Sequence, residues 1–187
     1  MKSFYMEREL KNPELDYSVY NLGISGDTTE DLMERFKFET KQRLHKEDEI
    51  IFIFAIGIND SQFICSKNNF SVLTNKFQKN IEQLIKFSKK MSSKTVFVGL
   101  TPVDEKKTIP IPWSTDKSYK NEYIKKYDNI IKSICQENNI HFIDMFSEFN
   151  KLNYKKLLED GLHPNSEGHQ KMFKIVRDFL VEYKIVR

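Results

Sequence analysis

Four short runs along the chain are rich in β-branched and aromatic residues, which is typical of buried strands. They cover residues 17–22, 50–56, 95–100 and 140–146. The second run, IIFIFAI, has no alternating polar positions. Such a strand is expected to be covered on both faces, as in a parallel sheet that lies between helices.

Segments with apolar residues near a period of 3.6 separate these runs and predict helices. They cover residues 4–11, 28–46, 71–90, 118–138 and 165–183. The alternation of helix and strand predicts right-handed βαβ units, and therefore a three-layer α/β/α sandwich around a mostly parallel sheet. The sequence contains no repeat and no linker-like stretch, so residues 1–187 are expected to form one domain. Functional sites in such folds lie at the carboxyl ends of the strands.

Composition and charge exclude several classes of protein. The 30 basic and 27 acidic residues alternate along the chain and leave a net charge of +3, so no basic face for nucleic acid is expected. No apolar run approaches the roughly 20 residues that a membrane-spanning helix needs. Cys65 and Cys135 have no metal-ligand spacing, which favours reduced thiols. Since the first residues do not form a signal peptide, we expect a cytoplasmic protein. We also expect it to need neither a metal nor a cofactor.

Glycine and polar residues follow the first two predicted strands. After the first comes Ser25-Gly26-Asp27-Thr28, where glycine permits a sharp turn and Thr28 or Asp27 can cap the next helix. Backbone N–H groups at such a helix start can bind an anion. After the second comes Gly57-Ile58-Asn59-Asp60, which brings an amide and a carboxylate to the end of an apolar strand. Each loop alone is also consistent with an ordinary turn.

Two later stretches carry further candidate chemistry. The proline-rich loop at 101–113 ends in Trp113, which either borders a substrate pocket or caps the core from outside. The stretch before the last helix is Asp160-Gly161-Leu162-His163-Pro164. A carboxylate that holds one ring nitrogen of a histidine fixes its tautomer and orientation, as in the base half of a nucleophilic triad. We interpret Asp144 as a loop or cap residue and His169 as a helix surface residue.

Taken together, Gly26, Gly57-x-Asn59-Asp60 and Asp160-x-x-His163 resemble, in order and spacing, three of the four sequence blocks of the SGNH/GDSL hydrolase family. The resemblance spans essentially the whole chain. It implies a flavodoxin-like sheet and a serine esterase that hydrolyses acyl or acetyl esters. It also implies that His163 is the general base oriented by Asp160, and that the Gly26 N–H and the Asn59 amide belong to an oxyanion hole. We expect acyl or sugar specificity to reside in the proline-rich loop near Trp113.

The family's first block, Gly-Asp-Ser at the end of a strand, has no counterpart in this sequence. The nucleophile is therefore unknown: Ser3 has no strand or glycine before it, and Ser25 belongs to the second block. We expect a chain truncated at its N-terminus and lacking the first strand of the sheet. Alternatively, a second copy or an exchanged strand completes the sheet, or the sheet has closed up in a protein that no longer hydrolyses esters.

Two other functions stay open at this point. A non-catalytic carbohydrate- or lipid-binding remnant of the same fold would account for the missing nucleophile, but not for the retained Asp160 and His163. A flavodoxin-like phosphate or flavin binder would use the loop around Gly26, but it gives Asn59 no role. No lysine follows this glycine as a P-loop requires, and the spacing of the acidic residues and His163 offers no metal-ligand pair.

Overall fold

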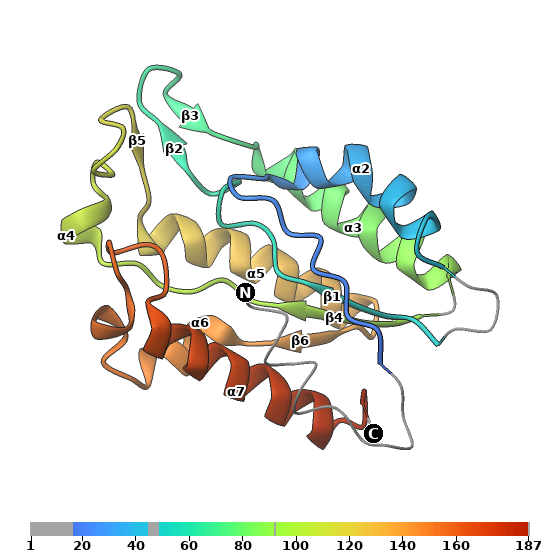
Figure 1. Ribbon diagram of the computed structural model, residues 1–187. Coiled ribbons are helices and arrows are strands. Elements are labelled where there is room, and N and C mark those ends of the chain that lie inside the picture. The colour runs from blue at the N-terminus through green and yellow to red at the C-terminus, as the bar shows by residue number, and fades with distance from the viewer. Residues whose placement is uncertain (1–16, 45–48, 92, 187) are drawn as a thin grey trace.

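A three-stranded parallel sheet forms the centre of the computed structural model, which describes residues 17–44, 49–91 and 93–186 (Figure 1). Strand β4 (Lys94–Val98) lies between β1 (Ile51–Phe54) and β6 (His141–Ile143). In the two pairings Ile51 lies opposite Lys94 and Val96 opposite His141. Three of the four predicted strands are thus confirmed, each shorter than the sequence pattern suggested.

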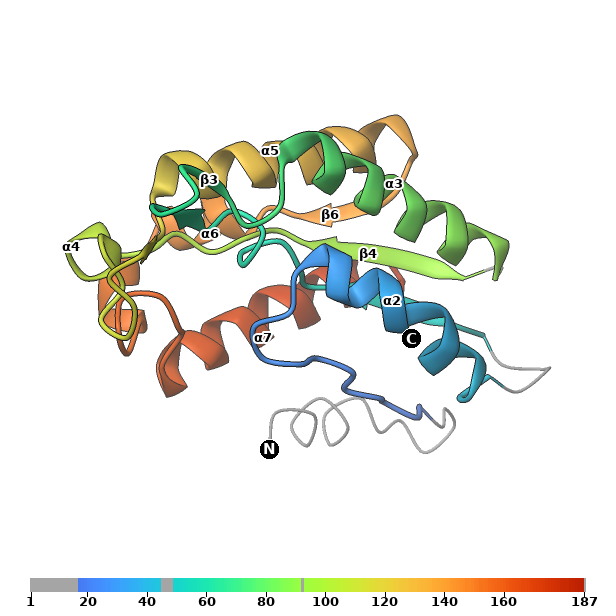
Figure 2. The same cartoon turned by 90° about the horizontal axis from the view of Figure 1, so that it is seen from above.

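Helices cover both faces of this sheet, so the predicted three-layer α/β/α sandwich is confirmed (Figure 2). One face packs against α2 (Thr29–Lys41), α3 (Thr74–Lys90) and α5 (Asn121–Glu137), and the other against α6 (Met145–Asn150) and α7 (Ser166–Glu182). The middle strand shows why: Phe97 belongs to the first core, whereas Val96 and Val98 belong to the second. Successive side chains of a strand point to opposite faces, and here both are buried.

A second, smaller sheet was not predicted. It is antiparallel and consists of β3 (Asn69–Phe70), β2 (Phe63–Ile64) and β5 (Lys117–Ser118), in that order. Together with α4 (Glu105–Thr108) it lies beyond the carboxyl ends of the parallel strands (Figure 1). Strands of two residues are too short to leave a periodic pattern in the sequence. Ser118 consequently lies in β5, and the helix predicted from 118 begins at Asn121 instead.

The strand predicted at 17–22 is wrong. This segment has no strand pairing, and it runs past the sheet without joining it (Figure 1). The Lys94 N–H donates to the Ile50 carbonyl, so the backbone groups of Ile51 and Ile53 point away from β4, and no described residue pairs with them. Ile53 is 38% exposed, which makes β1 less covered than its apolar sequence indicated.

The remaining predicted helices are confirmed with different ends, except 4–11, which lies outside the described residues. The helix predicted at 28–46 ends at Lys41, and the one predicted from 71 begins at Thr74. Asn165 caps α7, and its side chain accepts from the Gly168 N–H at 3.0 Å. Asp144 caps α6 as interpreted from the sequence, and a 3-10 helix, η1 (Tyr154–Leu157), follows. The starts of α6 and α7 are therefore fixed by polar caps.

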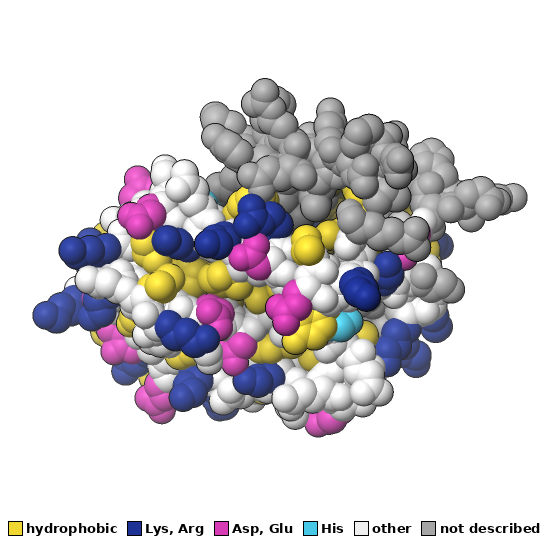
Figure 3. Space-filling view, turned by 90° about the horizontal axis from the view of Figure 1, so that it is seen from below, with side chains coloured by type: hydrophobic (Ala, Val, Ile, Leu, Met, Phe, Trp, Pro, Cys, Tyr) yellow, Lys and Arg dark blue, Asp and Glu magenta, His cyan; other side chains and the backbone are white. Residues whose placement is uncertain are grey.

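The face on which α7 lies shows charged side chains of both signs among apolar ones (Figure 3). Neither sign gathers into one patch on the described part of this face. Among the described helices, none combines the length and the apolar character needed to cross a membrane.

Candidate active site

The loop between η1 and α7 holds Asp160 and His163 in a tight turn. The backbone N–H groups of Leu162 and His163 both donate to Asp160 Oδ1, at 2.9 and 2.8 Å. Gly161, which lies between Asp160 and Leu162, has a φ of +92°, a backbone conformation that residues with a side chain rarely adopt. The loop is closed behind them, since the Glu159 N–H donates to the His163 carbonyl at 2.9 Å. The turn thus directs the second carboxylate oxygen toward the histidine ring.

Asp160 Oδ2 lies 2.7 Å from His163 Nδ1. Partial burial raises the pKa of the Asp160 carboxyl, but the hydrogen bonds from the His163 ring and from the backbone outweigh it, and the pKa lies below its usual value. An ionised carboxylate accepts the proton on Nδ1, which leaves the lone pair of Nε2 as the basic position of the ring. The His163 side chain is 59% exposed, so Nε2 is accessible to a reacting group.

Trp113 lies beside this histidine. Its ring stacks on the His163 ring with the centroids 5.7 Å apart and 30° between the planes. Trp113 sits in a turn closed by the bridge between Ile111 and Ser114, and it is 54% exposed. Its ring therefore forms an accessible apolar surface next to the base.

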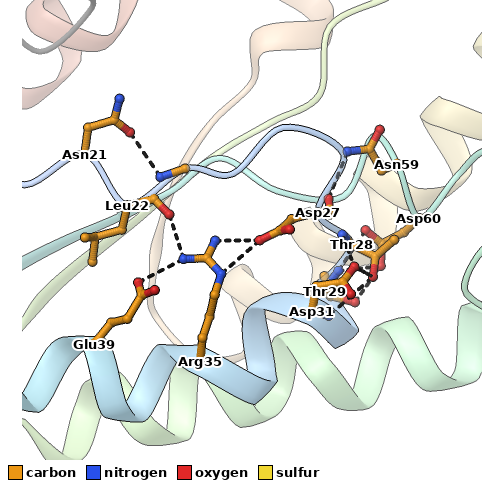
Figure 4. A network of polar contacts seen from close by, with 11 residues as sticks. Asn21, Leu22, Asp27, Thr28, Thr29, Asp31, Arg35, Glu39, Asn59 and Asp60 are labelled. Atoms are coloured by element: carbon orange, nitrogen blue, oxygen red, sulfur yellow. Dashed lines mark hydrogen bonds and ion pairs between the residues drawn. The ribbon is translucent and has the colours of Figure 1, made fainter.

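The loop around Gly26 leads into the start of α2. Gly26 has φ +87°, and an added Cβ would meet nothing within 4 Å, so backbone conformation rather than space favours glycine here. Arg35 of α2 fixes the loop from below: Nε and Nη2 donate to Asp27 Oδ2 at 2.9 and 2.6 Å, and Nη1 donates to the Leu22 carbonyl at 2.7 Å (Figure 4). The backbone that carries the Gly26 N–H is thereby held at both ends.

The N-terminus of α2 is already occupied by carboxylates of the chain itself. The Thr28 N–H donates to Asp31 Oδ2 at 2.8 Å, and the Thr29 N–H donates to Asp60 at 3.0 Å (Figure 4). The Thr29 hydroxyl also donates to Asp60. Burial raises the pKa of Asp60 to about 6 despite these bonds. Because these N–H groups have partners, this geometry argues against a phosphate site at the start of α2.

Asn59 lies against the Gly26 loop. Its Nδ2 donates to the Asp27 carbonyl at 2.9 Å (Figure 4). Its Oδ1 accepts from the Tyr119 hydroxyl at 3.0 Å. The structure therefore brings the two predicted oxyanion donors, Gly26 and Asn59, to neighbouring positions. An amide nitrogen carries two hydrogens, so one of them stays available for a ligand.

The structure thus forms two groups of candidate residues: Gly26 with Asn59, and Asp160 with His163 and Trp113. In the described part of the chain, no hydrogen bond or ring contact joins one group directly to the other, and no serine hydroxyl is bonded to His163. Nor do three His, Cys, Asp or Glu side chains cluster there as a metal site would require.

Two supporting residues, Arg35 and Tyr119, were not identified from the sequence. For Arg35 a signal existed, because Glu39 follows at the i, i+4 position and Arg35 Nη1 donates to it at 2.9 Å. Tyr119 is 60 positions away from Asn59, and no local pattern connects the two.

Comparison with solved structures defines the class of fold. The chain is similar to a lipase/acylhydrolase from Enterococcus faecalis, with a TM-score of 0.74 and 22% identity over 95% of this chain and 83% of that one. The chain is also similar to the acetyl xylan esterase AlAXEase, with a TM-score of 0.74 and 20% identity over 96% of this chain and 90% of that one. For Axe2, an acetylxylan esterase from Geobacillus stearothermophilus, the TM-score is 0.71 and the identity 22%, over 97% of this chain and 80% of that one. These likenesses establish the SGNH hydrolase fold.

The family itself follows from the sequence. The model of the GDSL-like lipase/acylhydrolase family matches residues 4–171, and the chain belongs to that family. No curated protein matches the chain.

Proposed function

We propose that this protein contributes the base and the oxyanion donors of an esterase site for acyl or acetyl esters. The observation that carries the proposal is the contact between Asp160 Oδ2 and His163 Nδ1 at 2.7 Å, in a chain that belongs to an acylhydrolase family. A site that only binds a ligand does not need an oriented base. The retained pair therefore favours catalysis over a binding remnant.

The proposed reaction is acyl transfer to a hydroxyl nucleophile. His163 Nε2 takes the hydroxyl proton while the oxygen attacks the ester carbon, and the charge moves to the former carbonyl oxygen. That oxyanion is stabilised by the Gly26 N–H and the free N–H of Asn59. His163 then passes its proton to the departing alcohol. A water molecule, deprotonated by the same nitrogen, releases the acid and restores the hydroxyl.

The attacking serine is the one part of this reaction that we do not assign. No described serine is bonded to His163, and the sequence has no Gly-Asp-Ser. If no serine of the chain attacks, the base and oxyanion donors have no nucleophile and the chain alone is inactive. Identifying the attacking group is therefore the first purpose of the experiment.

The substrate class we propose first is acetylated sugars. Two of the similar solved structures are acetyl xylan esterases. In this chain the exposed Trp113 ring next to His163 offers a flat apolar surface on which a sugar ring can stack. The same feature would serve a protein that binds carbohydrate without hydrolysing it, which is the second candidate function.

The test combines a fluorophosphonate probe with peptide mapping and p-nitrophenyl acetate hydrolysis. A covalent adduct on one serine would identify the nucleophile, and in His163→Ala both the adduct and the hydrolytic activity are then expected to be lost. The matched control is His169→Ala, which removes a histidine from the nearby α7. A folded chain that gives neither adduct nor hydrolysis would refute catalysis by the chain alone. Binding of acetylated xylo-oligosaccharide by that inactive chain would support the second candidate function.

A further inference from the structure

A chain of three hydrogen bonds passes through the Asn59 amide and ends at the Asp27 carbonyl. Gln62 Nε2 donates to the Tyr119 hydroxyl at 2.8 Å. That hydroxyl donates to Asn59 Oδ1 at 3.0 Å, and Asn59 Nδ2 donates to the Asp27 carbonyl at 2.9 Å. The chain starts in the segment before β2, passes through the end of β5, and reaches the loop before α2. It thus connects the small antiparallel sheet to both proposed oxyanion donors.

The direction of every bond in this chain is fixed by its last acceptor. A backbone carbonyl only accepts, so the end of the Asn59 amide that faces Asp27 must be the nitrogen. The other end is then the oxygen, which also only accepts, and Tyr119 must donate to it. Once its proton is used, the tyrosine oxygen must accept from Gln62. A flipped Asn59 amide would set two oxygens against each other at the Asp27 carbonyl.

Tyr119 and Gln62 are held rigidly enough to fix this orientation. Both side chains are buried. The Tyr119 backbone is bonded on both sides to Thr108: its N–H donates to the Thr108 carbonyl at 3.0 Å, and its carbonyl accepts from the Thr108 hydroxyl at 2.8 Å. Burial also raises the pKa of Tyr119 to about 12, so its hydroxyl stays protonated and remains a donor.

We propose that Tyr119, supported by Gln62, is a positioning residue that, together with the Asp27 carbonyl, holds the Asn59 amide so that its free N–H is presented to the oxyanion of the reaction. This inference rests on the proposed function. Tyr119 does not touch the reacting atoms and acts only through Asn59. A buried tyrosine whose hydroxyl merely satisfies its own hydrogen bonds would stabilise the fold without affecting the rate of acyl transfer.

The first test is a kinetic cycle in the full chain. Tyr119→Phe is expected to lower kcat about tenfold, the rate equivalent of one lost hydrogen bond, and to leave KM within about twofold. Asn59→Ala is expected to lower kcat by about a hundredfold or more. Because Tyr119 acts through Asn59, the double variant should be no slower than Asn59→Ala alone.

The matched control is Tyr127→Phe. Tyr127 is also fully buried, and its hydroxyl donates to the Val72 carbonyl rather than to Asn59. This control loses an equivalent hydroxyl and reports the effect of destabilisation alone. Equal rates in the two phenylalanine variants, or losses that multiply in the double variant, would overturn the inference. If Tyr119→Phe does not fold, Gln62→Met should give a smaller effect of the same kind.

A second readout does not depend on catalysis. In the wild-type chain the Asn59 side-chain amide proton that is bonded to the Asp27 carbonyl is expected to exchange slowly with solvent in an NMR measurement. Tyr119→Phe should accelerate that exchange about tenfold or more, whereas Tyr127→Phe should leave it unchanged. Unchanged exchange in Tyr119→Phe would refute the positioning role. A wild-type chain without esterase activity would instead refute the proposed function, and the exchange measurement would still decide the role of Tyr119.

Discussion

At the residue scale, the candidate base depends on how one carboxylate divides its hydrogen bonds. Asp160 uses Oδ1 for two backbone N–H groups and Oδ2 for the His163 ring. The backbone bonds fix the carboxylate, and the carboxylate fixes the ring. This pair could be predicted from the sequence because its members are three residues apart. The bond from Tyr119 to Asn59 could not, because it joins residues that only the fold brings together.

Replacing the carboxylate tests this arrangement. Asp160→Asn keeps the size of the side chain, but its amide can leave the wrong tautomer on His163, and we expect kcat to fall by about 10⁴. Hydrolysis of p-nitrophenyl acetate measures the loss, and circular dichroism checks the fold. Asp178→Asn on the exposed side of α7 is the control for loss of one negative charge. A loss below about tenfold would mean that Asp160 does not orient the base.

At the scale of elements, polar caps position the site as much as the strands do. Thr28 and Asp31 form a capping box at the start of α2, immediately after the Gly26 loop. Thr28→Ala removes this cap and should lower the free energy of unfolding by about 1 kcal/mol. Urea unfolding measures the change, and Thr28→Ser, which retains the hydroxyl, should recover most of it. No difference between Ala and Ser would show that the cap does not stabilise α2.

The sequence predicted the long elements well and the short or unpaired ones poorly. Helices α3, α5 and α7 have apolar faces that a 3.6-residue period reveals, so only their ends were misplaced. Residues 17–22 have the composition of a strand but are not part of either sheet, because composition alone does not bring a partner strand alongside. The strands β2, β3 and β5 are defined by pairing with each other rather than by their own sequence.

At the scale of the whole molecule, two buried carboxyls couple stability to pH. Burial raises the pKa of both Asp60 and Asp128 to about 6, from a usual value of 3.8. Between these values the folded chain binds more protons than the unfolded chain, so stability falls as pH rises. The stabilisation is fully present below pH 3.8 and is lost as pH rises through about 6. It amounts to roughly 3 kcal/mol for each group at most.

Asp60→Asn isolates one of these groups. The amide resembles the protonated carboxyl at every pH, so the variant should lose less stability than the wild type between about pH 4 and about pH 7. Urea unfolding at both pH values measures the two differences, and any pH-independent cost of the substitution cancels in the comparison. Identical losses in variant and wild type would show that Asp60 does not titrate in this range.

The outer edge of β1 makes a prediction about assembly. The backbone groups of Ile51 and Ile53 point away from β4 without a described partner, and Ile53 is 38% exposed. An apolar strand edge of this kind can pair with another chain. We therefore expect sedimentation velocity to show association that increases with protein concentration.

The variant Ile53→Lys should suppress this association, because a charge on an edge strand opposes pairing. Phe38→Lys, which replaces an exposed apolar residue of α2, should not. If both variants suppress association equally, non-specific hydrophobic contact between exposed apolar residues, rather than pairing at the strand edge, causes the association. A wild-type chain that stays monomeric throughout would mean that residues of its own protect the edge in solution.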